Sequence, residues 1–75
     1  MRLSDLKIGG KARIVRLQSG EKSYRQRLMA LGLLPGTVLT LARIAPLGDP
    51  IQISVRGCAL SLRKEEARIL QIEEV

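Results

Sequence analysis

Residues 23–36 read SYRQRLMALGLLPG, and this stretch predicts a short helix within a chain that is otherwise rich in strand-forming residues. Tyr24, Leu28 and Leu31 recur at i, i+4 and i+7, so they share one face of a helix. Ser23 stands three residues before a glutamine, which is the spacing of a capping box. We therefore expect a helix that begins at Tyr24 and lasts about two turns.

The end of the same stretch predicts a reversal of the chain. Gly32 stands where a left-handed residue commonly closes a helix, because glycine adopts a positive φ without a steric penalty. The dipeptide Pro35-Gly36 is typical of a type II turn. The chain should therefore turn back here and enter a strand.

Strand-forming sequence flanks the helix on both sides. Short runs of alternating or clustered apolar residues predict strands, and single helical turns are expected near the N-terminus and over residues 63–67. A chain of 75 residues holds one small domain, and five short strands can curl into a small barrel. We expect a mainly β, SH3-like, five-stranded barrel over residues 1–75, with a helical insertion after the first strand. The expected strands are 11–17, 37–45, 51–56, 59–62 and 68–73.

Composition points to a reducing compartment and to a soluble chain. Cys58 is the only cysteine, so no internal disulfide can form, whereas small secreted domains usually need several. An acid at Asp5 interrupts the region that a signal peptide would keep apolar. No uninterrupted apolar stretch approaches the roughly 20 residues of a membrane span. We expect a cytoplasmic protein with no direct membrane insertion.

The residue types in this chain give little support for catalysis or metal binding. The chain has no histidine, the usual acid–base group at neutral pH, and no Gly-rich loop ending in Gly-Lys-Ser/Thr. Asp5, Glu21 and Asp49 are isolated, and the adjacent pairs Glu65-Glu66 and Glu73-Glu74 are interpreted as solvated charge. Cys58 is interpreted as a small buried residue at a turn. We predict no enzyme activity, no cofactor, no metal site and no small-molecule substrate.

Charge is distributed unevenly along the chain. Residues 1–64 contain 12 basic and 3 acidic residues, whereas residues 65–75 contain 1 and 4, for a net charge of +6. A basic body favours an anionic partner, which can be an acidic protein surface, a nucleic acid or anionic lipid headgroups. Charge alone does not choose among these.

Three segments in register resemble the FeoA family of bacterial ferrous iron transport accessory proteins. They are residues 24–36, 45–51 and 60–64, which read YRQRLMALGLLPG, APLGDPI and LSLRK. The resemblance covers essentially the whole chain, and three matching segments are far more specific than one motif. It implies an SH3-like barrel that binds and regulates FeoB, the inner-membrane permease with a cytosolic GTPase domain, and is recruited to the inner face of the membrane.

The helix and the loop after it are the expected contact region for such a partner. Tyrosine is enriched in interface hot spots, a flexible thioether suits a partner surface, and arginines beside it provide a mixed basic and apolar patch. A leucine at the tip of the 46–50 loop could add an apolar contact. The expected partner-binding residues are Tyr24, Arg25, Arg27, Leu28, Met29, Leu31, Leu33 and Leu47.

Two alternatives stay open. A small basic barrel that binds nucleic acid would account for the pI near 10.5, although a single aromatic residue leaves little for base stacking. An exposed edge strand could also pair with a copy of itself and form a weak homo-oligomer.

Overall fold

The computed structural model describes residues 1–18 and 22–75, which form five strands and three helical segments. Their order agrees with the order expected from the sequence, and most boundaries shift by one or two residues. The elements are η1 (Leu3–Asp5), β1 (Lys11–Leu17), α1 (Lys22–Ala30), β2 (Val38–Ile44), β3 (Ile51–Val55), β4 (Cys58–Leu62), α2 (Lys64–Ala67) and β5 (Leu70–Glu74).

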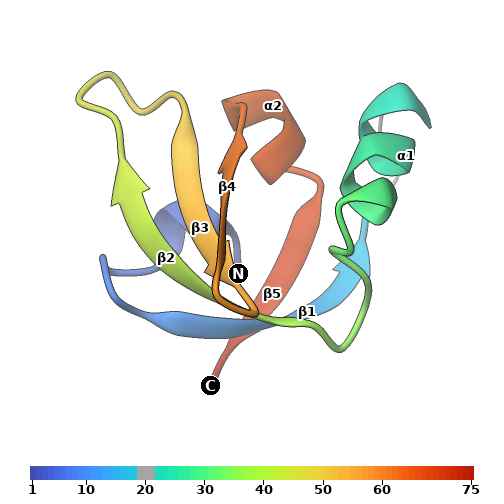
Figure 1. Ribbon diagram of the computed structural model, residues 1–75, viewed down its shortest axis with the longest axis horizontal. Coiled ribbons are helices and arrows are strands. Elements are labelled where there is room, and N and C mark those ends of the chain that lie inside the picture. The colour runs from blue at the N-terminus through green and yellow to red at the C-terminus, as the bar shows by residue number, and fades with distance from the viewer. Residues whose placement is uncertain (19–21) are drawn as a thin grey trace.

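The strands form one curled antiparallel sheet in the order β4-β3-β2-β1-β5 (Figure 1). Its register shifts between Ile14 and Arg16 on β1 and between Leu41 and Arg43 on β2. An extra residue in one strand of an antiparallel pair increases the local twist and bends that strand. The two bulges therefore curl the sheet, which confirms the SH3-like fold class although the sheet is not hydrogen-bonded into a closed barrel within the described residues.

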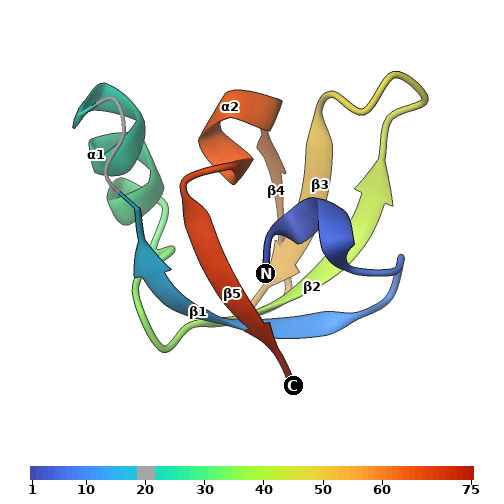
Figure 2. The ribbon, with the colours of Figure 1, turned by 180° about the vertical axis from the view of Figure 1, so that it is seen from behind.

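The concave face of the sheet holds the hydrophobic core. Alternate residues of each strand point inward, and η1 lies over this face between β5 and the β2–β3 pair (Figure 2). Leu3 and Leu6 are buried there, and the main chain of Gly9 and Gly10 is hydrogen-bonded to Leu41 of β2. The fully buried large side chains are Leu3, Ile14, Leu28, Leu33, Leu39, Leu41, Ile53, Leu62 and Leu70.

The helix α1 starts earlier than expected and ends as expected. Ser23 lies inside the helix, so the predicted capping box is wrong, and residue 21 before the helix lies outside the described residues. At the other end Gly32 has a φ of +86°, the Leu33 amide donates to the Leu28 carbonyl and the Gly32 amide donates to the Met29 carbonyl. This pair of bonds is a Schellman motif, which confirms the predicted role of Gly32.

The turn between β3 and β4 corrects the prediction for Cys58. Arg56 and Gly57 form the turn, both with positive φ (52° and 79°), and Val55 pairs directly with Cys58. Positive φ at both central residues is the geometry of a type I′ hairpin. Cys58 is therefore the first residue of β4, and it is exposed rather than buried.

Candidate protein-docking surface

The helix α1 is attached to the barrel through one face, and this decides which of its residues can reach a partner. Leu28 is completely buried, and Tyr24 packs against the core while part of its ring stays accessible. The sequence-based prediction includes Leu28 and Leu33 among the contact residues. That inclusion is wrong for the folded domain, because both side chains are 0% exposed.

Arg27 is engaged by a buried carboxylate. Its Nε lies 2.6 Å from Oε2 of Glu66, whose side chain is 3% exposed, and the other oxygen of Glu66 accepts a hydrogen bond of 2.9 Å from the Arg63 amide. The interpretation of Glu66 as solvated charge is therefore wrong, since this carboxylate ties α2 to α1. Arg27 serves this link and is not a free docking cation.

The two leucines after Gly32 point in opposite directions. In a Schellman motif the residue after the left-handed glycine packs back on the last turn of the helix. Leu33 occupies that position and is buried, while Leu34 is 43% exposed. Leu34 is not among the predicted contact residues. The position of Gly32 could have shown that Leu33 is buried and Leu34 is exposed, because the residue directly after the glycine packs on the helix.

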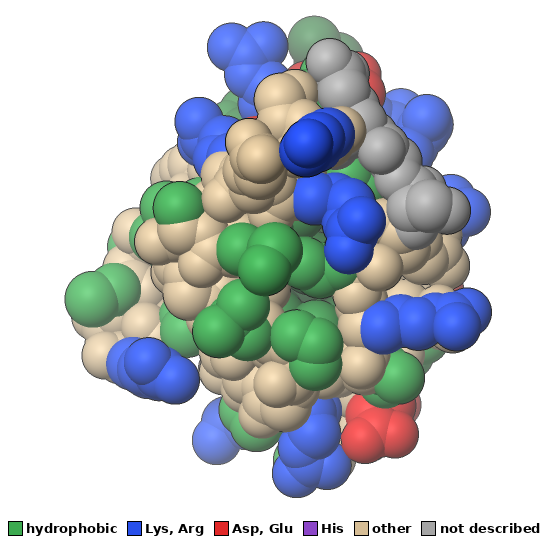
Figure 3. All heavy atoms as spheres, turned by 90° about the vertical axis from the view of Figure 1, so that its right-hand side faces the viewer, with side chains coloured by type: hydrophobic (Ala, Val, Ile, Leu, Met, Phe, Trp, Pro, Cys, Tyr) green, Lys and Arg blue, Asp and Glu red, His purple; other side chains and the backbone are tan. Residues whose placement is uncertain are grey.

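An exposed apolar surface surrounds the end of α1. Figure 3 looks onto this side of the molecule and shows hydrophobic side chains gathered in its middle, with Lys and Arg side chains around them. Met29 is 48% exposed and Leu31 is 36% exposed, so together with Leu34 they form what we call the α1 patch. Val15 and Val38, which are 45% and 41% exposed, are the exposed hydrophobic residues of the adjoining strands.

Val15 also lay outside the predicted contact residues. It is the extra residue of the β1 bulge, and it faces outward next to buried Ile14, as the alternation of side chains along a strand leads one to expect. The sequence signal for its position was the alternation of Ala12 and Ile14 with Arg13 and Val15 in the expected strand 11–17.

Backbone hydrogen bonds hold the loop of the α1 patch in place. The Gly36 amide donates to the Ile14 carbonyl at 2.7 Å, and the Ile14 amide donates to the Thr37 carbonyl at 2.8 Å. The Thr37 amide donates to the Leu34 carbonyl, and its hydroxyl donates to the Gly32 carbonyl at 3.3 Å. A loop that is ordered before binding loses less conformational entropy when a partner docks.

Leu47 does not join the α1 patch. It is 93% exposed at the tip of the β2–β3 loop, which lies at the opposite side of the sheet from α1 (Figure 1). The structure therefore brings together Arg25, Met29 and Leu31 of the predicted set, adds Leu34 to them and separates Leu47.

The chemistry that the described residues offer on this surface is that of binding. Exposed Met29 follows Arg25 by one helical turn on α1, and Arg25 pairs with no carboxylate of residues 1–18 and 22–75. Among the same residues no group of three or more Cys, Asp or Glu side chains is arranged to hold a metal ion. None of the described helices is long and apolar enough to span a bilayer.

Comparisons of this chain with known proteins agree on one family. The family model described as the FeoA domain matches residues 1–74. A curated relative from Porphyromonas gingivalis, described as an Fe(2+) transport protein A/Fe(2+) transporter FeoB fusion protein, is 37% identical over 73 residues. That alignment covers 97% of this chain and 8% of the fusion protein, so the chain spans a small part of that relative.

Similar proteins of known structure include members of the same family as the curated relative. The solution structure of FeoA from Chlorobium tepidum is 40% identical with a TM-score of 0.88, over 100% of this chain and 70% of that one. The crystal structure of zinc-complexed Stenotrophomonas maltophilia FeoA, described as a prokaryotic SH3 domain protein, is 25% identical with a TM-score of 0.83, over 97% and 89%. IdeR from T. acidophilum shares the fold at 20% identity and a TM-score of 0.89, over 34% of its length.

Proposed function

The chain belongs to the FeoA family of ferrous iron transport, and on that premise we propose that it is a non-catalytic accessory protein that binds and regulates a FeoB-type transporter. The contact is made by protein surface, without a cofactor. It brings the domain to the cytoplasmic face of the membrane that holds the transporter.

The observation that carries this proposal is the fusion of the two proteins in one relative. In the Porphyromonas gingivalis protein a segment like this chain is covalently joined to a FeoB transporter. A covalent link keeps two modules at a high effective concentration, which is useful when they act on each other. Two modules that act on each other need a surface of contact.

The α1 patch is the surface that we assign to this contact. Met29, Leu31 and Leu34 provide apolar area, and Arg25 beside them favours an acidic rim on the partner. Tyr24, which is partly buried against the core on the same helix, adds an aromatic side chain near this contact. Buried apolar and aromatic anchors with charged neighbours are the usual source of binding energy in such interfaces.

Calorimetric titration with substituted proteins tests the proposal. The wild-type chain is titrated into the detergent-solubilised FeoB-type transporter from the same cell and into its soluble GTPase domain. Met29→Gln combined with Leu34→Gln should weaken binding by roughly 100-fold, since each replaces an exposed apolar anchor. The matched control is Ile8→Gln, because Ile8 is also exposed (60%) and lies on the N-terminal segment before β1.

Ile8→Gln should bind like the wild type. Equal loss of affinity in the control and in the double variant would contradict the assignment of the α1 patch. Absence of saturable binding to either form of the transporter would contradict the proposed function itself.

Nucleic-acid binding is the second candidate, and the net charge of +6 favours it. A mixed RNA sample in the same titration separates the two candidates. Binding that depends on phosphate contacts alone falls steeply with rising salt, whereas contact through an apolar patch is much less sensitive.

A further inference from the structure

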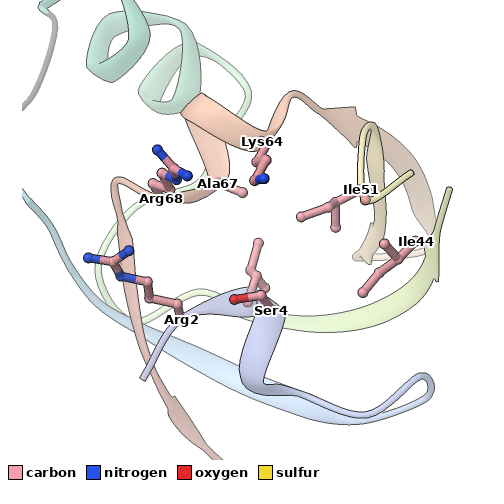
Figure 4. A pocket seen from close by; sticks show the side chains of 9 residues that line it. Arg2, Ser4, Ile44, Ile51, Lys64, Ala67 and Arg68 are labelled. Carbon is pink, nitrogen blue, oxygen red and sulfur yellow. The ribbon is translucent and has the colours of Figure 1, made fainter. Parts of the chain in front are cut away.

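A cavity of about 260 Å³ opens on the side of α2 away from α1 (Figure 4). Its floor is the edge of the core, formed by Leu3, Ile51 and Ala67, which are 1%, 4% and 3% exposed. Pockets for drug-sized molecules hold about 300–1,000 Å³. The smaller volume here suits a headgroup or a single side chain rather than an extended ligand.

Three cationic side chains stand around this cavity. Arg2 comes from the residue before η1, and Lys64 and Arg68 come from the two ends of α2. None of the three forms an ion pair with a carboxylate within residues 1–18 and 22–75. Unpaired cations that converge on one opening favour an anionic occupant, and the planar fork of arginine matches the oxygens of a phosphate group.

The charged and apolar groups occupy different sides of the cavity. In Figure 4 Arg2 and Arg68 lie together on one side, and Ile44 and Ile51 lie on the other, with Lys64 above the opening between them. An occupant that satisfies both sides is amphiphilic, with its anionic group next to the arginines and its apolar part over the isoleucines.

The apolar side of the cavity continues into Leu47. Ile44 and Gly48 both line the cavity, and Leu47 lies between them in the β2–β3 loop with 93% of its surface exposed. Figures 1 and 2 show this loop and α2 projecting from the same end of the molecule. Peripheral proteins enter the headgroup region of a membrane by combining exposed apolar side chains with neighbouring basic residues, and Leu47 with the cations of the cavity offers that combination.

We propose that this end of the domain binds the surface of an anionic membrane directly. The cavity holds the phosphate of one phospholipid headgroup between Arg2 and Arg68, Lys64 contacts the same anion, and Leu47 enters the boundary between headgroups and acyl chains. This binding goes beyond the proposed transporter contact and does not require it. It uses the opposite side of α2 from the α1 patch, so both contacts fit on one molecule.

Nearby acidic groups reduce the positive field without removing it. Asp49 accepts a hydrogen bond of 3.1 Å from the Lys64 amide, and Glu65 is exposed on α2. Glu66 is buried and already paired with Arg27. Asp5 is also exposed and accepts a hydrogen bond of 3.0 Å from the Arg2 amide. The three cations line the cavity, whereas Asp5, Asp49 and Glu65 do not.

Vesicle sedimentation tests the proposal with the whole chain and no transporter present. Vesicles of phosphatidylcholine mixed with phosphatidylglycerol should bind the protein, and vesicles of phosphatidylcholine alone should not. The combined substitution R2Q, K64Q and R68Q should lower affinity on the order of 100-fold, since each basic residue near an anionic surface contributes roughly fivefold. Leu47→Gln should lower it roughly tenfold.

The matched control removes the same charge elsewhere. Lys11, Arg16 and Arg56 are exposed and lie outside the cavity lining, so K11Q, R16Q and R56Q together change the net charge equally. This control should lose less than about tenfold, because charges beyond a Debye length of the membrane are screened. Ile8→Gln, with a side chain that is also exposed, is the control for Leu47→Gln and should bind like the wild type.

Each contrary outcome overturns the membrane assignment. Equal loss in the cavity variant and its control would show general charge attraction. Saturation of the cavity by glycerol phosphate without vesicle binding would make it a site for a soluble phosphate ester. Binding of an acidic, apolar peptide that the cavity variant loses, again without vesicle binding, would make it a protein-docking site. All variants must unfold at the temperature of the wild type, which their exposed positions lead us to expect.

Discussion

Adjacent residues of the same type have opposite roles in this domain, and the pair Glu65-Glu66 is the clearest case. Glu65 is exposed, whereas Glu66 is 2% exposed and binds both Arg27 and the Arg63 amide. The sequence predicted solvated charge for both, because two neighbouring glutamates carry no local sign of which one faces the core. Only the docking of α2 against α1 makes that choice.

The role of Glu66 leads to a prediction about stability. Glu66→Ala should lower the free energy of unfolding by about 1–3 kcal/mol, since it leaves a partly buried amide and an arginine without their acceptor. The estimate stays below that for a fully buried pair because the Arg27 side chain is 57% exposed. Urea denaturation measures the change. Glu65→Ala is the control and should stay within about 0.5 kcal/mol of the wild type; a similar loss in both variants would contradict the role given to Glu66.

The neighbours Leu33 and Leu34 give a second matched pair. Leu33→Ala should cost about 2–5 kcal/mol of unfolding free energy, as expected for a fully buried leucine. Leu34→Ala should cost less than about 1 kcal/mol and should weaken transporter binding instead. Denaturation and calorimetry on the same two proteins separate the effects. The division between core and docking surface fails if Leu34→Ala destabilises the fold as much as Leu33→Ala.

At the scale of the elements, local turn chemistry was the most predictable part of the structure. Gly32 and Pro35-Gly36 reverse the chain as expected, because positive φ favours glycine so strongly. The start of α1 was less predictable, since Ser23 had the right spacing for a cap and yet lies within the helix. The two bulges were not predicted, since the expected strands gave no sign of where an extra residue would be inserted.

The Schellman motif at the end of α1 can be tested at Gly32. No atom lies within 4 Å of the position that a Cβ would take there, so the cost of a side chain is backbone strain alone. Gly32→Ala should lower the free energy of unfolding by about 1–2 kcal/mol. Gly32→Asn should cost less, because asparagine tolerates the left-handed region. Thermal and urea denaturation measure the stability of both variants. An alanine variant as stable as the wild type would contradict the left-handed conformation of residue 32 in this Schellman motif.

At the scale of the whole molecule, the sequence predicted the fold class and the family, and it predicted the docking surface less well. Hydrophobic patterning places the strands and most of the core, because alternation has the same period as a strand. Which side chains remain exposed depends on tertiary packing, and the local sequence pattern does not reveal that packing. Of the predicted contact residues, Leu28 and Leu33 are buried in the core and Arg27 forms an ion pair. The β2–β3 loop that carries Leu47 lies far from α1.

At the same scale, we propose that the two sides of α2 make two different contacts, so that the whole domain acts as a small adaptor at a membrane. In these proposals the α1 patch contacts the transporter, and the cationic cavity with Leu47 contacts lipid. The first assignment is the central one, since the family membership and the fusion relative both lead to it.

The most direct test of that assignment is the amide spectrum of the isotopically labelled domain during titration with the soluble GTPase domain or the detergent-solubilised transporter. We predict that the shifted or broadened signals belong to Val15, Met29, Leu31, Leu34 and Val38 and their neighbours, while the signals of Arg2 and Gly48, which line the side of the cavity away from α2, remain unchanged. Changes confined to the cavity and the β2–β3 loop, or no changes with a transporter shown to be folded, would contradict the account.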